Sequence, residues 1–370
     1  SMTAFEKTSS LPSPSLLFDA DRIEDNLDRM LEMVGGVTSR LRPHIKTHKC
    51  AEVLDLQLAK GINQVKCATI AEAELSAQRN IPDVLIACPL VGTNARRLRE
   101  LIDSYKGTRF SAIVDSPEGV AALTSEGARE LPVYIDLDCG MHRTGIAPGQ
   151  SALNLVRSIL AAPALTFAGV HAYDGHIHEP DLTLRTSAFE EAMSMVDGFL
   201  ELLNREDIEV PAVVAGGSPT FALHAKRADT HPQWQCSPGT PVLWDAGYAL
   251  HFPDLPFEPA CFLLARVISR PGNDLACLDL GHKAVSAENP LENRVRFQSF
   301  GNLEFVSQSE EHLVVRCTDS DRMLIGNDLI GIPYHGCPTV ALHQRAHVVR
   351  DGAVTDEIWA IAARDRVLTL

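Results

Sequence analysis

The chain has 370 residues, of which 45% are hydrophobic and 22% charged, an ordinary composition for a globular protein of two domains. Its formal net charge of −15 argues against nucleic acid or an anionic membrane surface as the main partner. No apolar stretch is long enough to cross a bilayer, and the first residues lack a signal-peptide pattern. The nine cysteines are odd in number and show no paired spacing, so we expect a reducing, cytoplasmic location.

Strand-like and helix-like segments alternate along residues 15–245. Apolar, strand-like runs lie at 16–18, 41–47, 65–68, 83–88, 110–114, 133–137, 166–173, 210–215 and 234–236. Helical segments lie between them, at 21–34, 51–60, 70–79, 94–104, from 117 onward, and at 150–161, 181–204 and 219–224. About eight βα units predict a parallel sheet closed into a (β/α)8 TIM-type barrel. An open doubly wound sheet is the alternative, but no Gly-x-Gly-x-x-Gly follows the first strand.

The pattern changes near residue 250, after which short strands separated by turn signals replace the alternation. These strands are expected at 262–268, 275–279, 303–306, 312–316, 340–341 and 346–350. We therefore expect an α/β barrel domain at residues 15–252 and a C-terminal all-β domain at 253–370. Residues 3–14, polar and rich in proline and serine, form an extended lead-in that could pack on the second domain.

The stretch 41–49 is unusually basic for a barrel strand. On an extended chain Arg42, His44, Lys46 and His48 fall on one face. That face points into a site holding an anion, or it is a solvated edge with clustered charge. Lys46 stands among other cations, a setting that favours the neutral amine, and a neutral amine is the species that forms a Schiff base.

Polar, glycine-containing segments follow the expected barrel strands, where the active sites of such barrels lie. They occupy residues 46–49, 68–69, 138–145, 171–178, 215–220, 237–240 and 244–248. A single loop of this kind is common. Their meeting at one end of a barrel predicts a functional site.

Two of these segments suggest a phosphorylated cofactor. The Gly-Gly-Ser turn at 216–218 precedes a short helix and could cradle a phosphate, or it is a plain turn. Arg143 could face a phenolate oxygen or a ring nitrogen, or it could pair with Asp136 or Asp138. A lysine, an arginine and a phosphate cradle together fit pyridoxal 5′-phosphate (PLP).

A His-x-Cys pair, His335 and Cys337, lies in the second domain. On an extended chain side chains at i and i+2 point the same way, and imidazole nitrogen with thiolate sulfur suits Zn²⁺ or another borderline divalent ion. With two protein ligands the other positions would be open to water or substrate, as in catalytic sites. The pair alone is a weak motif, and a purely structural role is the alternative.

Five motifs carry a family resemblance over nearly the whole chain. They are Arg42–Lys49, Lys66–Glu74, Asp138–Gly145, Gly216–Ser218 and His335–Cys337. The sequence resembles the D-threonine aldolase and D-serine dehydratase-like group of fold-type III PLP enzymes, which are relatives of alanine racemase. The resemblance implies a barrel followed by a C-terminal β domain, usually assembled as a homodimer.

The resemblance also implies roles for particular residues. Lys46 would hold PLP through a Schiff base, Arg143 would contact the PLP ring or its O3′, and Tyr173 would lie beside the cofactor. Residues near the phosphate would be Gly216, Gly217, Ser218 and Thr220, with Gly239, Thr240 and Tyr248 as neighbours. His335 and Cys337 would bind a divalent metal (Mn, Mg or Zn) next to the substrate.

The function implied is a PLP- and metal-dependent lyase acting on small β-hydroxy-D-amino acids. Retro-aldol cleavage to glycine and an aldehyde is favoured, with His178, His176 or a metal-bound water as the base. Dehydration of D-serine or 3-hydroxyaspartate to a 2-oxo acid and ammonia is the alternative. Cys337 resembles the dehydratase branch, whereas Tyr173–His176 resembles the aldolase branch. A racemase needs no metal, and a non-catalytic PLP-binding protein needs no domain at 258–370, so both are less favoured.

Overall fold

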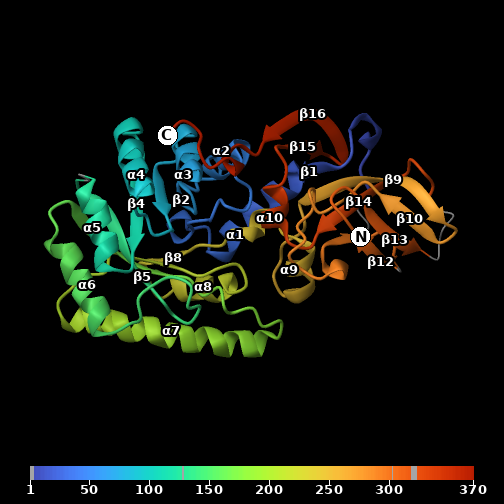
Figure 1. Cartoon of the computed structure of the whole chain (residues 1–370). Helices are drawn as coiled ribbons and strands as arrows, with labels where there is room; N and C mark the ends of the chain where they lie inside the picture. The colour runs from blue at the N-terminus through green and yellow to red at the C-terminus, as the bar shows by residue number, and fades with distance from the viewer. Residues whose placement is uncertain (1–3, 127–128, 302, 318–322) are drawn as a thin grey trace. The chain divides into compact units, whose positions relative to one another are not determined.

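The computed structural model describes residues 4–126, 129–301, 303–317 and 323–370 (Figure 1). The chain forms two compact units, which we call the barrel unit and the sheet unit. The barrel unit comprises Met30–Lys46, Ala51–Gly239 and Asp365–Leu370; the sheet unit comprises Ser1–Arg29, Thr47–Cys50 and Thr240–Arg364. The expected boundary lay between residues 252 and 253, whereas the first strand and the stretch from Thr240 lie in the sheet unit.

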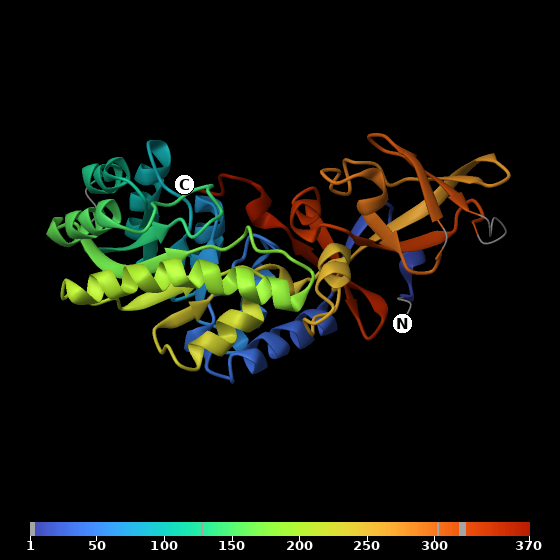
Figure 2. The same ribbon diagram turned by 90° about the horizontal axis from the view of Figure 1, so that it is seen from below.

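The barrel unit contains a parallel sheet whose strands follow one another in chain order. They are β2 (Gln64–Cys67), β3 (Asp83–Ile86), β4 (Arg109–Val114), β5 (Leu131–Leu137), β6 (Leu165–Ala172), β7 (Ala212–Ala215) and β8 (Trp234–Cys236). Helices connect the strands on the outside of the sheet, and the 24-residue α7 runs along one side of the unit (Figure 2). They are α2 (Ala51–Ala59), α3 (Ile70–Gln78), α4 (Thr93–Ser104), α5 (Pro117–Ser125), α6 (Gln150–Ala161), α7 (Leu182–Arg205) and α8 (Phe221–Ala228).

The segment 41–45 closes this sheet into a barrel as its eighth strand position. Leu41 bridges Cys236 of β8, and His44 bridges Lys66 of β2, both in parallel. The segment is too irregular to count as a strand of the sheet, since Pro43 has no N–H and takes part only through its carbonyl, which accepts the Lys66 N–H at 2.9 Å. Eight parallel positions therefore confirm the predicted (β/α)8 barrel.

Local sequence signals set the starts of several barrel helices. Thr69, Ser116 and Asp181 each accept a backbone N–H of the first turn, before α3, α5 and α7 respectively. Gly169 in β6 allows a close approach of β7, because a Cβ there would lie 1.9 Å from the Ala212 carbonyl oxygen. No helix in the described part of the chain is long and apolar enough to cross a membrane.

The sheet unit is built on a second, mainly antiparallel sheet. Its strands are β1 (Ser15–Asp19), β9 (Cys261–Gly272), β10 (Leu275–Leu278), β11 (Val295–Phe297), β12 (Leu303–Gln308), β13 (Leu313–Cys317), β14 (Asp328–Pro333), β15 (Arg345–Arg350) and β16 (Ala353–Ala360). The main path runs β12-β13-β10-β9-β1-β15-β16, and β14 pairs with β9 and β11. The unit also holds α9 (Ala246–His251) and α10 (Gly336–Val340), while α1 (Ala20–Met33) leads from this unit into the barrel unit.

Strands β11, β14 and β16 were not expected, the expected strand 41–47 forms only isolated bridges, and two further elements differ in place or kind. The run 16–18, expected as the first barrel strand, is β1, which lies between β9 and β15 in the second sheet. All of β1 is buried, and a continuous apolar run suits an inner strand of either sheet equally well. Residues 340–341, expected as a strand, are the last residue of α10 and the residue after it. Pro338 occupies the first turn of this helix, where its missing N–H costs no hydrogen bond.

The N-terminal segment packs on the sheet unit's core. Phe5 meets Phe262 edge to face at 5.1 Å, and Glu6 exchanges backbone hydrogen bonds with Gly352 and Val354. The core beneath it contains Leu17, Ala246, Phe262, Leu264, Ile332, Val349 and Val354. Residue 3 of the expected lead-in 3–14 lies outside the described residues.

Candidate active site

Lys46 lies at the end of the segment that closes the barrel, in a turn held by the preceding histidine. The Lys46 backbone N–H donates to Nδ1 of His44 at 3.1 Å, and His44 is buried. In the sheet unit the Cys50 N–H donates to Nδ1 of His48 in the same way, at 3.0 Å. The two histidines therefore shape the backbone around Lys46 and do not form one cationic face with it.

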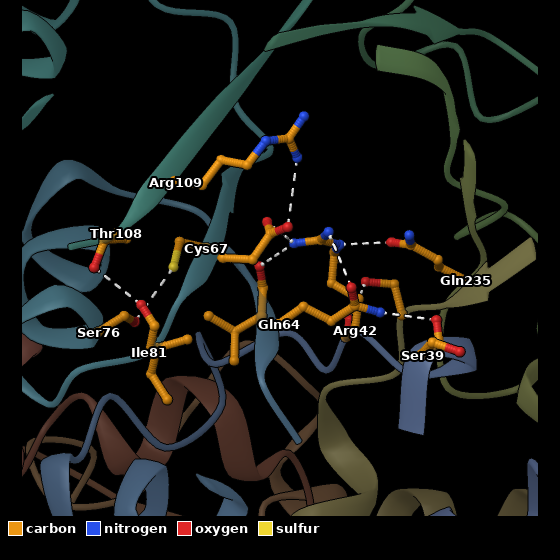
Figure 3. Close-up of polar contacts among 12 residues, drawn as sticks. Ser39, Arg42, Gln64, Cys67, Ser76, Ile81, Thr108, Arg109 and Gln235 are labelled. Carbon is orange, nitrogen blue, oxygen red and sulfur yellow. Dashed lines mark hydrogen bonds and ion pairs between the residues drawn. The ribbon is translucent and has the colours of Figure 1, made fainter. Parts of the chain in front are cut away.

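Arg42 has a structural partner set inside the barrel unit (Figure 3). Its guanidinium is 1% exposed, forms an ion pair with Asp83 at 2.8 Å, and donates to Gln235 Oε1 at 2.8 Å. It also donates to the Val65 carbonyl at 3.1 Å. The expectation that Arg42 shares an anion-binding face with Lys46 is wrong, because these partners already satisfy its buried charge.

The Tyr173 ring is surrounded by positive side chains of the barrel unit. The Arg143 guanidinium lies 4.9 Å from the ring centroid, Lys66 Nζ lies 5.6 Å from it and Lys46 Nζ 5.8 Å. Such cation–π distances are attractive and leave the charges available to an anionic ligand. Gly175 keeps the ring in place, since a Cβ there would lie 2.2 Å from the Tyr173 Cε1 atom.

The Arg143 loop is pinned through carboxylates that bind other groups. Asp138 accepts from the His142 ring at 2.7 Å, and Asp136 accepts from the His171 ring at 2.8 Å and the Thr144 hydroxyl at 2.9 Å. Of the two alternatives for Arg143, the structure therefore supports the one in which its guanidinium faces the site.

The Gly-Gly-Ser turn rests on a buried carboxylate that sequence reasoning missed. Asp174 accepts the Gly217 N–H at 3.0 Å, the Thr220 hydroxyl at 2.8 Å and His224 Nε2–H at 2.7 Å. Burial alone would raise the pKa of Asp174, but His224 and these hydrogen bonds outweigh it and lower that pKa. The turn is thus held from inside, with Ser218 beside it and buried.

Gly216 is required in this turn. Its φ of +87° lies in the left-handed region, and a Cβ would lie 2.2 Å from the His224 ring. Gly217 has its backbone close to Tyr173, since a Cβ there would lie 3.0 Å from Tyr173 Cε2. The structure therefore brings this turn together with Tyr173, as the predicted cofactor site requires.

Lys66 is the second residue that the sequence analysis left out of the site. It lies in β2, only 2% exposed, with Nζ 3.3 Å from His171 Nε2. Burial, followed by the charge of Lys46, lowers the pKa of Lys66 to about 7. A lysine between two apolar residues of one strand, Val65 and Cys67, was the available signal.

The two candidate bases differ in burial. Nδ1 of His176 is buried, and it is among the side-chain atoms of the described residues that have no hydrogen-bond partner. The His176 ring packs against Gly140, where a Cβ would lie 2.6 Å from Nε2. His178 is exposed. The structure therefore places His176 better than His178 for binding a group within the barrel unit.

The predicted metal pair lies in the sheet unit at the start of α10. His335 is the N-cap residue and Cys337 is in the first turn, so the pair is not on an extended chain as expected. Burial lowers the pKa of His335, but its interactions with Cys337 and with Glu288 outweigh this and raise it to about 9. Glu288 accepts a short hydrogen bond from His335 Nδ1.

Neighbouring groups hold the metal pair in place. Cys337 Sγ lies 3.1 Å from Thr47 Oγ1 and 3.7 Å from Thr240 Oγ1, which puts Thr240 beside the metal pair. Asp245 accepts the Gly336 N–H at 2.8 Å. Within the described residues no group of three or more His, Cys, Asp or Glu side chains could hold a metal. A metal here would have His335 and Cys337 as its protein ligands.

The last two predicted cofactor neighbours belong to different units. Gly239 ends the main stretch of the barrel unit and is buried. Tyr248 belongs to α9 of the sheet unit, where its N–H donates to Asp245 and its ring packs on Trp244 at 5.2 Å.

Comparisons with known proteins agree with this architecture. A family model described as "Alanine racemase, N-terminal domain" matches residues 18–239, and one described as "Putative serine dehydratase domain" matches residues 260–349. D-threonine aldolase from Arthrobacter sp is 30% identical, covering 95% of this chain and 92% of that protein. 3-Hydroxy-D-aspartate aldolase from Paracoccus denitrificans (strain Pd 1222) is 29% identical, covering 97% and 93%.

A solved structure shows the same fold along the chain. The crystal structure of D-threonine aldolase from Filomicrobium marinum has a TM-score of 0.88 and 28% identity, covering 98% of this chain and 97% of that one. D-threo-3-hydroxyaspartate dehydratase from Delftia sp. (strain HT23) is 26% identical over 90% of this chain and 92% of that protein.

The fold and the site define an alanine racemase-like protein of the PLP-dependent class. The chain belongs to the family that joins an alanine racemase N-terminal domain to a serine dehydratase domain, whose members include D-threonine aldolase, 3-hydroxy-D-aspartate aldolase and D-serine dehydratase. The resemblance predicted from the five motifs is therefore confirmed. These homologues are lyases, and both aldolases and dehydratases occur among them.

Proposed function

We propose that this protein is a PLP- and divalent-metal-dependent lyase that cleaves β-hydroxy-D-amino acids to glycine and an aldehyde. The observation that carries the proposal is Lys46 at a barrel strand end, facing the same aromatic ring as Arg143. The aldolase reaction is favoured because the relatives at 29% and 30% identity, and the solved structure at 28%, are aldolases.

The residues of the barrel unit fit PLP. Lys46 supplies a primary amine that would hold the cofactor covalently, and Arg143 would neutralise charge on the ring's oxygen. The Gly216–Ser218 turn lies close to Tyr173, where the phosphate would bind, and the Gly217 N–H donates to Asp174, which holds the turn in place. PLP bound there would supply the electron sink into which the broken bond's electrons pass.

The donor set of the sheet unit fits a divalent metal. His335 nitrogen and Cys337 sulfur suit Zn²⁺ or Mn²⁺, and Glu288 would orient the imidazole by accepting from Nδ1, leaving Nε2 for the metal. Such an ion would supply a Lewis acid for the substrate hydroxyl. A mutant of a D-threo-3-hydroxyaspartate dehydratase has been solved in a metal-free form, so a metal-bound form is implied for that relative.

His176 is the candidate base that we favour over His178. Its buried Nδ1 is free to accept a proton from a ligand, whereas His178 is exposed. In this proposal His176 would accept the proton of the substrate hydroxyl, directly or through a water.

Dehydration of D-serine or a 3-hydroxyaspartate is the second candidate reaction. The cysteine ligand, Cys337, and the 26% identical dehydratase relative favour it. In that reaction Lys46 Nζ would accept the α-proton, and the hydroxyl would leave as water.

A product assay separates these reactions. Purified protein with PLP and Mn²⁺ is incubated with D-threonine and, separately, with D-serine, alongside Lys46→Ala as the control. We expect glycine and acetaldehyde from D-threonine, and a visible absorbance band that Lys46→Ala lacks. Ammonia with a 2-oxo acid would establish the dehydratase instead, and recovery of L-amino acid alone would establish a racemase. A protein that never binds PLP would refute both lyase proposals. The homodimer stays a prediction, which light scattering would test.

A further inference from the structure

We propose that Lys66, aligned by His171 and Asp136, is a proton-transfer residue of the barrel site, distinct from the cofactor-holding Lys46. This inference rests on the proposed function, because it gives Lys66 a step in the same lyase reaction. Lys66 would hold at Nζ the proton that the substrate's α-carbon receives.

Lys66, His171 and Asp136 form a chain of hydrogen bonds with one direction. His171 donates its Nδ1–H to Asp136 Oδ1 at 2.8 Å, which leaves Nε2 with a lone pair. Lys66 Nζ lies 3.3 Å from that Nε2 and donates to it. The same carboxylate–imidazole order aligns nucleophiles and bases in unrelated enzymes. All three side chains are buried, so water does not compete for these hydrogen bonds.

The charge state of Lys66 also suits proton transfer. Buried lysines are normally paired with a carboxylate, whereas Lys66 reaches Asp136 through a neutral imidazole. Burial and the charge of Lys46 lower its pKa to about 7, the range in which an amine can both give and take a proton near neutral pH. The charged groups that act on it are Lys46, Asp136, Asp174 and Arg42.

Lys66 also lies over the same aromatic ring as Lys46. Lys66 Nζ and Lys46 Nζ lie 5.6 and 5.8 Å from the same Tyr173 ring centroid. Both amines therefore lie over the ring beside which PLP would bind in the proposed function.

The proton balance closes without a further reactant. In the aldol reaction one proton leaves the substrate hydroxyl and one proton passes from Lys66 Nζ to the α-carbon, giving glycine and the aldehyde. The proton taken from the hydroxyl returns to the neutral Lys66 through solvent. In the reverse sense, neutral Lys66 removes an α-proton from glycine, so the enzyme would exchange that hydrogen with solvent.

The test measures this exchange on the holoenzyme with PLP and Mn²⁺. The rate at which glycine loses its α-hydrogen in D₂O is followed by NMR from pH 5.5 to 9, and PLP binding is followed by its visible band. Lys66→Met removes the amine without leaving a buried charge, and Lys66→Arg keeps a charge that is not released. Lys226→Met, at an exposed lysine of α8, is the matched control.

We expect both Lys66 variants to bind PLP with the wild-type absorbance maximum. Exchange and kcat should fall about 10²-fold or more in both, with KM little changed, because general acid–base groups contribute about that factor. In both Lys66 variants the dependence of the exchange rate on pH near 7 should disappear. In His171→Asn that dependence should shift to another pH. The control should match the wild type.

Three results would overturn the inference. Wild-type exchange with an unchanged pH profile in Lys66→Arg would show that only the positive charge matters. A change in KM alone in Lys66→Met would make Lys66 an anion-binding residue. Wild-type exchange without glycine formation from D-threonine would refute the aldolase proposal and leave the role of Lys66 standing. A wild type with bound PLP but no exchange would refute both.

Discussion

Asp174 provides the sharpest test of how the glycine turn is supported, through the substitution Asp174→Asn. The carboxylate accepts from Gly217 through Oδ1, and from Thr220 and His224 through Oδ2. His224 cannot turn its ring to compensate, because its Nδ1 already accepts the Trp234 indole N–H at 3.1 Å. The amide must therefore point a donor at one of these donors.

The magnitude follows from the better of the two amide orientations. The amide oxygen keeps the position of Oδ2, and the amide nitrogen faces the buried Gly217 N–H. One hydrogen bond to a charged acceptor is lost, worth about 1.5–3 kcal/mol, and a buried N–H stays unsatisfied at about 1–3 kcal/mol. Because these terms overlap, we expect the free energy of unfolding to fall by about 3 kcal/mol.

Urea unfolding followed by tryptophan fluorescence at pH 7 measures this change, with Asp229→Asn as the control. Asp229 pairs with Arg40 at the surface, where its side chain is 64% exposed, so its loss should cost under about 1 kcal/mol. The folded-state pKa of Asp174 is lowered, so its stabilisation is present above the ordinary aspartate pKa of 3.8 and is lost as pH falls through the lower folded-state pKa. The difference between wild type and Asp174→Asn should therefore shrink in acid. If the free energy of unfolding of Asp174→Asn at pH 7 lies within about 1 kcal/mol of the wild-type value, the change is no larger than that of an ordinary surface substitution, and the reasoning is refuted.

Three further predictions concern the site and its support. Mn²⁺ affinity, measured by calorimetry, should rise about tenfold per pH unit toward pH 9 and then level off, because the raised pKa of His335 means that the metal must displace its proton. A flat profile would count against His335 as a ligand. His335→Ala should behave like the wild type treated with a chelator. Gly175→Ala should displace the Tyr173 ring, which a Cβ would approach at 2.2 Å, and weaken PLP binding about tenfold or more in an absorbance titration; unchanged binding would show that the ring position is unimportant. Arg42→Met should lower stability by about 3 kcal/mol in urea unfolding, because Asp83 loses its buried partner, and should leave the Lys46–PLP band intact; loss of that band with retained stability would restore an anion-binding role for Arg42.

The barrel could be predicted from periodicity, but the sheet to which the run Leu16–Phe18 belongs could not. The run Leu16–Phe18 has the composition of any inner strand, and its partners in β9 and β15 lie far along the sequence. Alternation along the chain carries no information on such distant pairing. The eighth position of the barrel, residues 41–45, is held by two isolated bridges around Pro43. It therefore looks less like a strand than the run 16–18, which was expected as the first barrel strand.

The site was predicted unevenly for a similar reason. Glycines and charged residues in loops are visible in a sequence, so Lys46, Arg143 and Gly216 could be predicted as site residues. Lys66 and Asp174 act from within or beside strands, and their roles depend on which side chains three-dimensional packing brings to them. Arg42 shows the opposite error, since a charge that looked free is fully paired across the barrel.

The place of β1 in the second sheet has a consequence for biosynthesis. Leu16 pairs with Ala346, about 330 residues later, so the strand waits through nearly the whole of translation for its partner. At roughly 5–20 residues per second that delay is on the order of 15–65 s. Until β9 is made this buried strand has open edges on both sides, and its second edge stays open until β15 is made, which is the kind of segment that templates aggregation. Nascent chains of this protein are therefore expected to need shielding at their first strand, and variants that slow synthesis late in the chain should lower the yield of folded protein without touching its stability.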